Sequence, residues 1–177
     1  MATAHQGMST DALALLRPVG KFRHTPYPGV LIGTVAPSEA DRAQTDSKSL
    51  LAHWHGEKPE AFKYLNRFTP IDGTTCFEGD DVTEELCVAL EDRAASLCGQ
   101  RFYVRANLRG LKGRVERQAC ERALGSFLWE QSGKHGDPAV VAFDDVDVVV
   151  MIEVIGRRAG FGFLDRKVRG LELVKPR

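Results

Sequence analysis

The stretch RFYVRANLR, from Arg101 to Arg109, carries the clearest structural signal in the sequence. Apolar and polar residues alternate along it, with Phe102, Val104, Ala106 and Leu108 in one set and Arg101, Tyr103, Arg105, Asn107 and Arg109 in the other. Successive side chains of a β-strand point to opposite faces of the sheet, so this alternation predicts a half-buried strand. One face is expected to pack in a core, and the other is expected to be basic and polar.

Helices are predicted on both sides of this strand. Upstream, apolar residues recur at helical spacing from Val82 to Leu97, after Asp80 or Asp81 as the N-cap. Acidic residues in the first turn suit the helix dipole. Downstream, a loop of glycine and basic residues leads into a helix whose apolar residues run from Val115 to Leu128.

The remaining elements are predicted from shorter patterns. After the second helix, the strands are expected at Ala139 to Phe143, Val146 to Ile155 (central and fully buried) and Ala159 to Leu164. The first third of the chain predicts a helix at Thr10 to Leu16, a strand at Val30 to Val35, helical segments after Ser38 and from Lys48 to His53, and a strand at Tyr64 to Ile71. This helix, strand, helix, strand order resembles a ferredoxin-like unit that lacks its first strand.

Composition bounds the class of protein. The chain has 177 residues, of which 43% are hydrophobic, as in an ordinary globular protein. No apolar run approaches the roughly 20 residues that a membrane span needs. The first ten residues lack the basic start and apolar stretch of a secretory signal. The sequence therefore predicts a soluble, cytoplasmic protein that makes no contact with a membrane.

Charge is unevenly distributed, although the formal net charge is zero. Between residues 77 and 96 the acids are Glu78, Asp80, Asp81, Glu84, Glu85, Glu91 and Asp92, against Arg93 alone. Between residues 100 and 134 the cations dominate, and further arginines and lysines follow from Arg157 to the C-terminus. A neutral protein can thus carry a strongly basic face.

Catalytic and metal-binding patterns are not found in the sequence. The cysteines form no CxxC pair. His53 and His55 are the two histidines that lie close together in the sequence, and they belong to no HExxH motif and have no cysteine nearby. The cysteines are therefore expected to be small buried hydrophobic residues, with no disulfide and no metal. There is no Ser-His-Asp order, phosphate loop or dinucleotide fingerprint. We expect no cofactor and no enzymatic activity.

Four segments, taken in order, resemble a THUMP domain, the RNA-binding module of several tRNA-modifying enzymes. They are the strand from Arg101 to Gly110, the helix segment Ala123 to Gly125, VAFDDVD from Val141 to Asp147, and VMIEVIG from Val150 to Gly156. The third is similar to the family pattern V-D-L-x-N-P-D and the fourth to E-I-I-G. The resemblance covers residues 77 to 164. Upstream, the segment from Tyr64 to Ile71 looks like the joint between a ferredoxin-like segment and a THUMP domain.

The resemblance implies an α+β fold, with a reduced ferredoxin-like segment over residues 1–76 and a THUMP domain over residues 77–177. Stand-alone THUMP proteins present tRNA to a separate acetyltransferase that makes N4-acetylcytidine, so the implied function is that of a non-catalytic tRNA-binding adaptor. Cations that follow RNA phosphates are required for this function, helped by main-chain amides at a helix N-terminus. The predicted RNA-binding residues are Arg101, Arg105, Asn107, Arg109, Lys112, Arg114, Arg117, Arg122 and Arg158.

Alternatives stay open at this point. The chain could serve another tRNA modification system, or be a protein-interaction module whose acidic helix from Val82 to Leu97 meets a basic partner. A small enzyme that uses Asp144, Asp147 and Glu153 is a third hypothesis. Turn chemistry is favoured for the aspartates, and for Glu153 a structural role is favoured, either at the sheet edge or paired with an arginine. The oligomeric state, a homodimer included, is not decided by the sequence.

Overall fold

The computed structural model describes residues 1–35, 48, 51 and 61–175. These residues form two compact units, each described here by itself: an N-terminal unit of residues 1–70 and 167–175, and a C-terminal unit of residues 71–166. Spatial contacts thus divide the chain at residue 70 and again at residue 166, whereas the sequence suggested a domain boundary at residue 76. Contacts alone do not define folding domains, so that boundary stays a prediction. The helical segments expected after Ser38 and from Lys48 lie largely outside the described residues.

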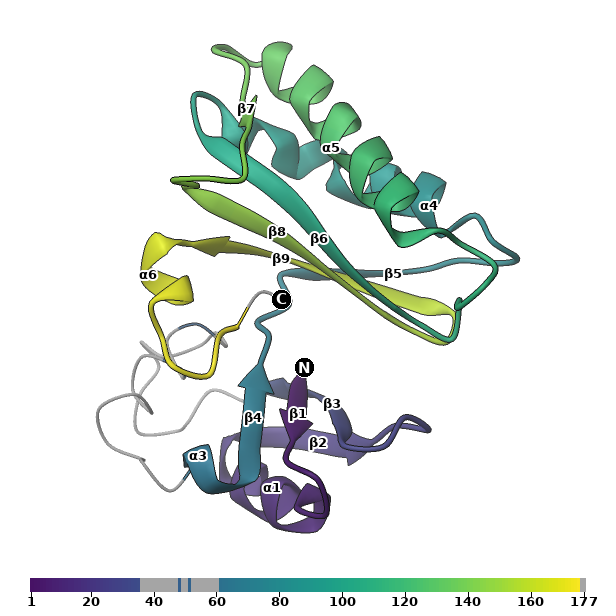
Figure 1. The fold of residues 1–177 in the computed structure, drawn as a ribbon, viewed down its shortest axis with the longest axis vertical. Coiled ribbons are helices and arrows are strands. Elements are labelled where there is room, and N and C mark those ends of the chain that lie inside the picture. Colours follow the sequence, from purple (N-terminus) through teal and green to yellow (C-terminus); the bar gives the residue numbers. More distant parts are fainter. Residues whose placement is uncertain (36–47, 49–50, 52–60, 176–177) are drawn as a thin grey trace. The chain divides into compact units, whose positions relative to one another are not determined.

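The N-terminal unit contains a four-stranded sheet among its described residues (Figure 1). Its elements are β1 (Ala2–Ala4), α1 (Ser9–Leu16), η1 (Arg17–Val19), β2 (Gly20–His24), β3 (Val30–Val35), α3 (Ala61–Tyr64) and β4 (Leu65–Phe68). The strand order is β2-β3-β1-β4, and all neighbours are antiparallel. The expectation of a missing first strand is wrong, because β1 pairs with β3 and β4 on its two sides. Its short sequence of small residues, Ala-Thr-Ala, has no alternating pattern that would predict a strand.

The end of the described chain returns to this unit after α6 (Arg166–Arg169). The N–H of Phe68 donates to the carbonyl of Leu173 at 2.8 Å. Leu173 and Val174 are both buried. The last described residues are therefore part of the fold.

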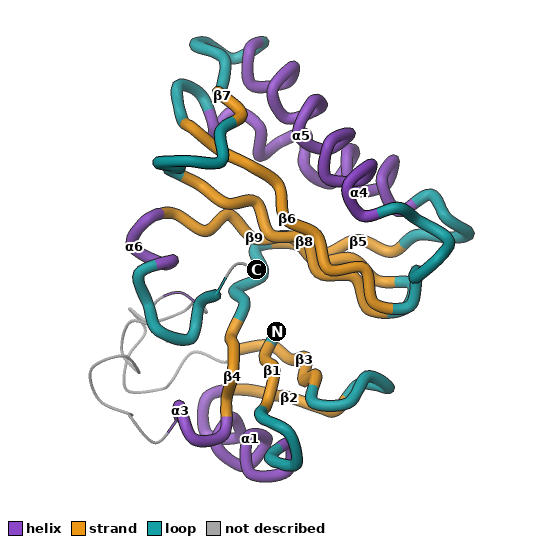
Figure 2. Tube along the Cα trace, viewed as in Figure 1, coloured by secondary structure: helices purple, strands orange, loops and turns teal. Residues whose placement is uncertain are grey.

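The C-terminal unit is a five-stranded sheet with helices on one face (Figure 2). Its elements are β5 (Gly73–Cys76), α4 (Val82–Leu90), η2 (Glu91–Leu97), β6 (Arg101–Arg109), α5 (Arg117–Gly133), β7 (Val140–Val141), β8 (Val148–Ile155) and β9 (Arg158–Asp165). The strand order is β5-β9-β8-β6-β7, with β6 parallel to β7 and β8 and the other pairs antiparallel. Sheets with helices gathered on one face make this an α+β protein.

The core of the C-terminal unit confirms the alternation read from β6. Phe102, Val104 and Ala106 are buried in one cluster with residues of α4 and α5, among them Leu86 and Leu124. Arg101, Tyr103, Arg105, Asn107 and Arg109 are half-buried, on the opposite face of the sheet from the two helices. In the described part of the chain, no helix combines the length and the apolar character required to cross a membrane.

Candidate nucleic-acid interface

The sheet surface opposite α4 and α5 carries the polar side chains of β6, and we call it the β6 face. Strand register extends it across β8 and β9, because residues paired in neighbouring strands share a face. Asn107 pairs with Glu153, and Glu153 pairs with Gly160. Arg109 pairs with Ile155, which pairs with Arg158, so these two arginines occupy one row. Neighbouring strands lie about 4.8 Å apart, so the backbones of Arg109 and Arg158, two strands apart, are separated by roughly 10 Å.

The nine predicted RNA-binding residues do not form one surface. Arg101, Arg105, Asn107, Arg109 and Arg158 lie on the β6 face. Arg117 and Arg122 lie on α5, which covers the other face of the sheet. Linear spacing cannot show this separation, because a crossover from strand to helix places consecutive segments on different layers.

The N-terminus of α5 is already occupied by a carboxylate. Glu116 is its N-cap, and its side chain accepts the N–H groups of Gln118 and Ala119 at 2.9 and 2.5 Å. A carboxylate at this position satisfies the same amides that would otherwise hold a phosphate. In this structure Glu116 satisfies two of these amides, and RNA binding by the main chain at this helix stays a prediction.

Glu153 binds two of the predicted contact residues on the β6 face, Asn107 and Arg109. It is 3% exposed, accepts a hydrogen bond from Asn107 at 3.0 Å and forms an ion pair with Arg109 at 2.5 Å. Of the two structural roles expected for Glu153, the arginine partner is confirmed, and the sheet-edge position is wrong because β8 lies between β9 and β6. Because the carboxylate is buried, Arg109 is needed to compensate its charge, and the pair is part of the fold.

Other predicted cations also have carboxylate partners. The ion pairs are Arg101 with Asp145 (3.2 Å), Arg114 with Asp80 (2.6 Å), Arg117 with Glu121 (4.0 Å) and Arg122 with Glu116 (3.8 Å). Within the part of the chain that the structure describes, Arg105, Lys112 and Arg158 form no ion pair. Arg105 is half-buried on β6, whereas Lys112 and Arg158 are exposed. Among the predicted RNA-binding cations, these three are the ones that no carboxylate of the described residues neutralises.

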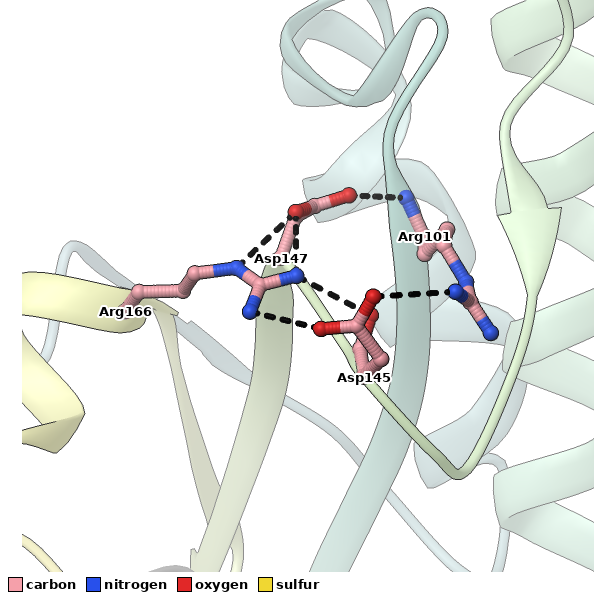
Figure 3. A network of polar contacts seen from close by, with 4 residues as sticks. All are labelled: Arg101, Asp145, Asp147 and Arg166. Atoms are coloured by element: carbon pink, nitrogen blue, oxygen red, sulfur yellow. Dashed lines mark hydrogen bonds and ion pairs between the residues drawn. The ribbon is translucent and has the colours of Figure 1, made fainter.

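A polar network closes one end of the β6 face (Figure 3). Asp147 accepts the main-chain N–H of Arg101 at 2.8 Å, and Arg166 bridges Asp145 at 2.8 Å and Asp147 at 2.9 Å. The hydrogen bond from the Arg101 amide and that from Arg166 hold the pKa of Asp147 below its ordinary value. Asp145 adopts a positive φ of 49°. The turn chemistry expected here is seen in the positive φ of Asp145, but the amide that Asp147 binds belongs to β6, 46 residues away, and not to a neighbour in the turn.

Sequence reasoning missed several polar and aromatic contacts around β6. Glu121 of α5 accepts the N–H of Ala106 at 2.9 Å, so a helix side chain satisfies a strand amide. Tyr103 contacts Phe143, with ring centroids 5.8 Å apart. No local pattern reveals either contact, because the partners are 15 and 40 residues apart in the sequence.

The described residues contain no group of three or more His, Cys, Asp or Glu side chains that could hold a metal ion. Cys120 is buried, but Cys87 and Cys98 are half-buried and Cys76 is exposed, so the expectation of buried cysteines holds only for Cys120. Burial is the main cause that raises the pKa of the Cys87 and Cys120 thiols. Both therefore favour the unreactive thiol form.

No protein-family model and no curated protein sequence matches the chain. Among solved structures, TrmN from Thermus thermophilus is similar over 92% of this chain and 43% of its own, with 20% identity and a TM-score of 0.55. A 4-thiouridine synthetase, solved with RNA and bound ATP, is similar over 87% of this chain and 35% of its own, with 11% identity and a TM-score of 0.49. The chain spans less than half the length of either structure. The likeness to TrmN shows a shared fold.

Proposed function

We propose that this chain is a THUMP domain protein that binds tRNA on its β6 face and serves a tRNA-modifying system without performing the chemistry itself. The observation that carries the proposal is the charge of that face. Its arginines are Arg101, Arg105, Arg109 and Arg158. Asp145 pairs with Arg101 and Glu153 with Arg109, while Arg105 and Arg158 form no ion pair among the described residues. Excess cations along a strand suit a phosphate backbone.

The resemblance in sequence suggests which system is served. Stand-alone THUMP proteins present tRNA to an acetyltransferase, so we propose cytidine acetylation by a separate enzyme as the reaction. The N-terminal sheet supports a ferredoxin-like assignment for that unit, since its order β2-β3-β1-β4 is entirely antiparallel and α1 connects β1 to β2. Another tRNA-modifying enzyme as the partner remains the alternative within the same class.

A protein-interaction module is the second candidate function. Helix α4 exposes Glu84, Glu85 and Val88, and Val88 is 72% exposed. An acidic helix surface with an apolar centre suits a basic protein partner. This surface does not compete with the β6 face for residues, so a tRNA measurement separates the two functions.

The test is equilibrium binding of bulk tRNA over a series of salt concentrations. Each phosphate contact on a single strand contributes about −0.7 to the slope of log affinity against log salt. Replacing Arg105 by Ala is expected to weaken binding and to flatten the slope by about 0.7, because no carboxylate of the described residues pairs with that arginine. Arg109 is a poorer choice, since its loss would leave the buried Glu153 uncompensated.

Arg93→Ala is the matched control, because Arg93 is exposed on η2 within the acidic segment. It should leave both affinity and slope unchanged. Equal binding by the Arg105→Ala and Arg93→Ala proteins would remove the β6 face as the RNA site. No binding of tRNA by the unmodified protein would instead favour the protein-interaction module.

A further inference from the structure

An aromatic pair, of which one ring is exposed and the other half-buried, lies at the edge of the β6 face. Phe143 follows β7, and 78% of it is exposed to solvent. Its ring lies beside that of Tyr103, with centroids 5.8 Å apart and planes inclined by 35°. Tyr103 points away from the helices, on the β6 face. A phenyl ring left this exposed contributes little to the core.

The loop that carries Phe143 is held at both ends. Before it, the N–H of Ala142 donates to the carbonyl of Phe102 at 2.9 Å. After it, Asp147 exchanges hydrogen bonds of 2.8 Å with the main chain of Arg101, and Arg166 bridges Asp145 and Asp147 (Figure 3). Fixing the loop in this way lowers the entropy that Phe143 would lose on contact with a ligand.

A cation lies close to the pair on the same strand. Arg105 is two residues from Tyr103, on the same face and about 7 Å away along the backbone. It forms no ion pair among the described residues. A flat aromatic surface beside an uncompensated arginine matches a nucleotide, whose base offers a π-face and whose phosphate offers a negative charge.

We propose that Phe143 and Tyr103 form a stacking platform for one unpaired nucleobase of the bound RNA, while Arg105 contacts a phosphate next to that base. The proposal rests on the RNA-binding function proposed above and names the part of the RNA that reaches this end of the β6 face. The base must be unpaired, because a base stacked within an A-form helix does not offer its face to a side chain.

The experiment measures the affinity of the full chain for a fluorescent single-stranded RNA oligonucleotide of mixed sequence, and for its duplex with the complementary strand, at several salt concentrations. Phe143→Ala should weaken single-strand binding about tenfold, within the range seen for loss of one base–aromatic stack. The salt slope should not change, because Phe143 carries no charge. Duplex binding should be unaffected, and Phe143→Trp should retain single-strand affinity.

Val141→Ala is the matched control, because Val141 is an exposed apolar residue of the neighbouring strand β7. It should bind as the unmodified protein does. Thermal unfolding of Phe143→Ala should be unchanged, since the side chain is exposed. Phe143→Leu should lose affinity nearly as Phe143→Ala does, because it keeps apolar surface but has no ring.

If Phe143→Ala binds the single strand with full affinity while Arg105→Ala binds weakly with a flatter slope, the stacking platform is overturned and the RNA-binding function survives. Phe143 is then better explained as a contact for a protein. Equal loss of single-strand and duplex affinity in Phe143→Ala would also overturn it. If the unmodified protein binds neither of these two RNAs, the stacking platform is overturned, and the measurement with bulk tRNA decides the RNA-binding function separately.

Discussion

Carboxylates decide which arginines of this protein are available to a ligand. Glu153 engages Arg109, Asp145 engages Arg101, and Asp80 engages Arg114. Glu116 accepts main-chain N–H groups of α5 and lies near Arg122. Glu121 accepts a main-chain N–H group of β6 and lies near Arg117. A run of basic residues in sequence therefore overstates the charge that RNA would meet. Arg105, Lys112 and Arg158 are the residues at which substitution tests RNA binding with least disturbance of internal pairs.

The depressed pKa of Asp147 predicts how its contribution to stability changes with pH. Its folded pKa lies below the value near 3.9 of an unfolded aspartate. The stabilisation is therefore fully present above about pH 4 and is lost as the pH falls through the folded pKa. Asp147→Asn should lower the midpoint of thermal unfolding at pH 7, and its difference from the unmodified protein should narrow in melts at about pH 3.

Asp144→Asn is the control for this comparison, because Asp144 is an exposed neighbour for which no hydrogen bond or ion pair is seen among the described residues. It should unfold like the unmodified protein at both pH values. A difference between Asp147→Asn and the unmodified protein that stays constant with pH would show that the ionised carboxylate is not the stabilising group.

At the scale of elements, close packing around a glycine holds β5 to β9. Gly73 pairs with Phe161, and a Cβ atom added at Gly73 would lie 2.4 Å from the Phe161 ring. That ring is buried and meets Phe163 edge-on, so it has little freedom to move. Gly73→Ala should destabilise the C-terminal unit by about 1–3 kcal/mol, as overpacking does.

Chemical denaturation of the full chain measures this effect. Thr74→Ala is the control, since Thr74 is an exposed residue of the same strand. Thr74→Ala should lower the free energy of unfolding by well under about 1 kcal/mol, as surface substitutions do. A Gly73→Ala protein as stable as Thr74→Ala would mean that the Phe161 ring relaxes without cost.

Elements with a long apolar pattern were predictable from the sequence, and short ones were not. The alternation in β6 and the apolar run in β8 gave both strands, with β8 beginning two residues later than expected. The helix predicted from Val82 to Leu97 changes to a 3-10 helix after Leu90. β1 and β5 were missed, because Ala-Thr-Ala and Gly-Thr-Thr-Cys contain no large apolar residue. Their pairing depends on partners distant in sequence.

The candidate site was predictable only in part, for the same reason. The cations of β6 and their common face were predicted from the alternation, and the structure confirms that this face is the side away from the helices. The sequence could not reveal their carboxylate partners, which lie about 35 to 45 residues away for Arg101, Arg109 and Arg114. Nor could it show that Glu116 occupies the amides at the start of α5.

At the scale of the whole molecule, a formal net charge of zero is compatible with RNA binding. Acidic side chains gather on α4 and η2, while the β6 face carries arginines. The two regions belong to opposite faces of one sheet, since α4 packs on the core side. The proposed association with tRNA would then be governed by the local field of one face.

The most direct measurement of the central claim is ultraviolet crosslinking of the full chain to tRNA, followed by identification of the crosslinked peptides by mass spectrometry. RNA bound on the β6 face predicts crosslinks in residues 101–113 and around Phe143, and their loss in competition with unlabelled tRNA. Crosslinks confined to residues 82–97 of α4 and η2, or unaffected by competitor, would contradict the claim that this chain holds tRNA on the β6 face.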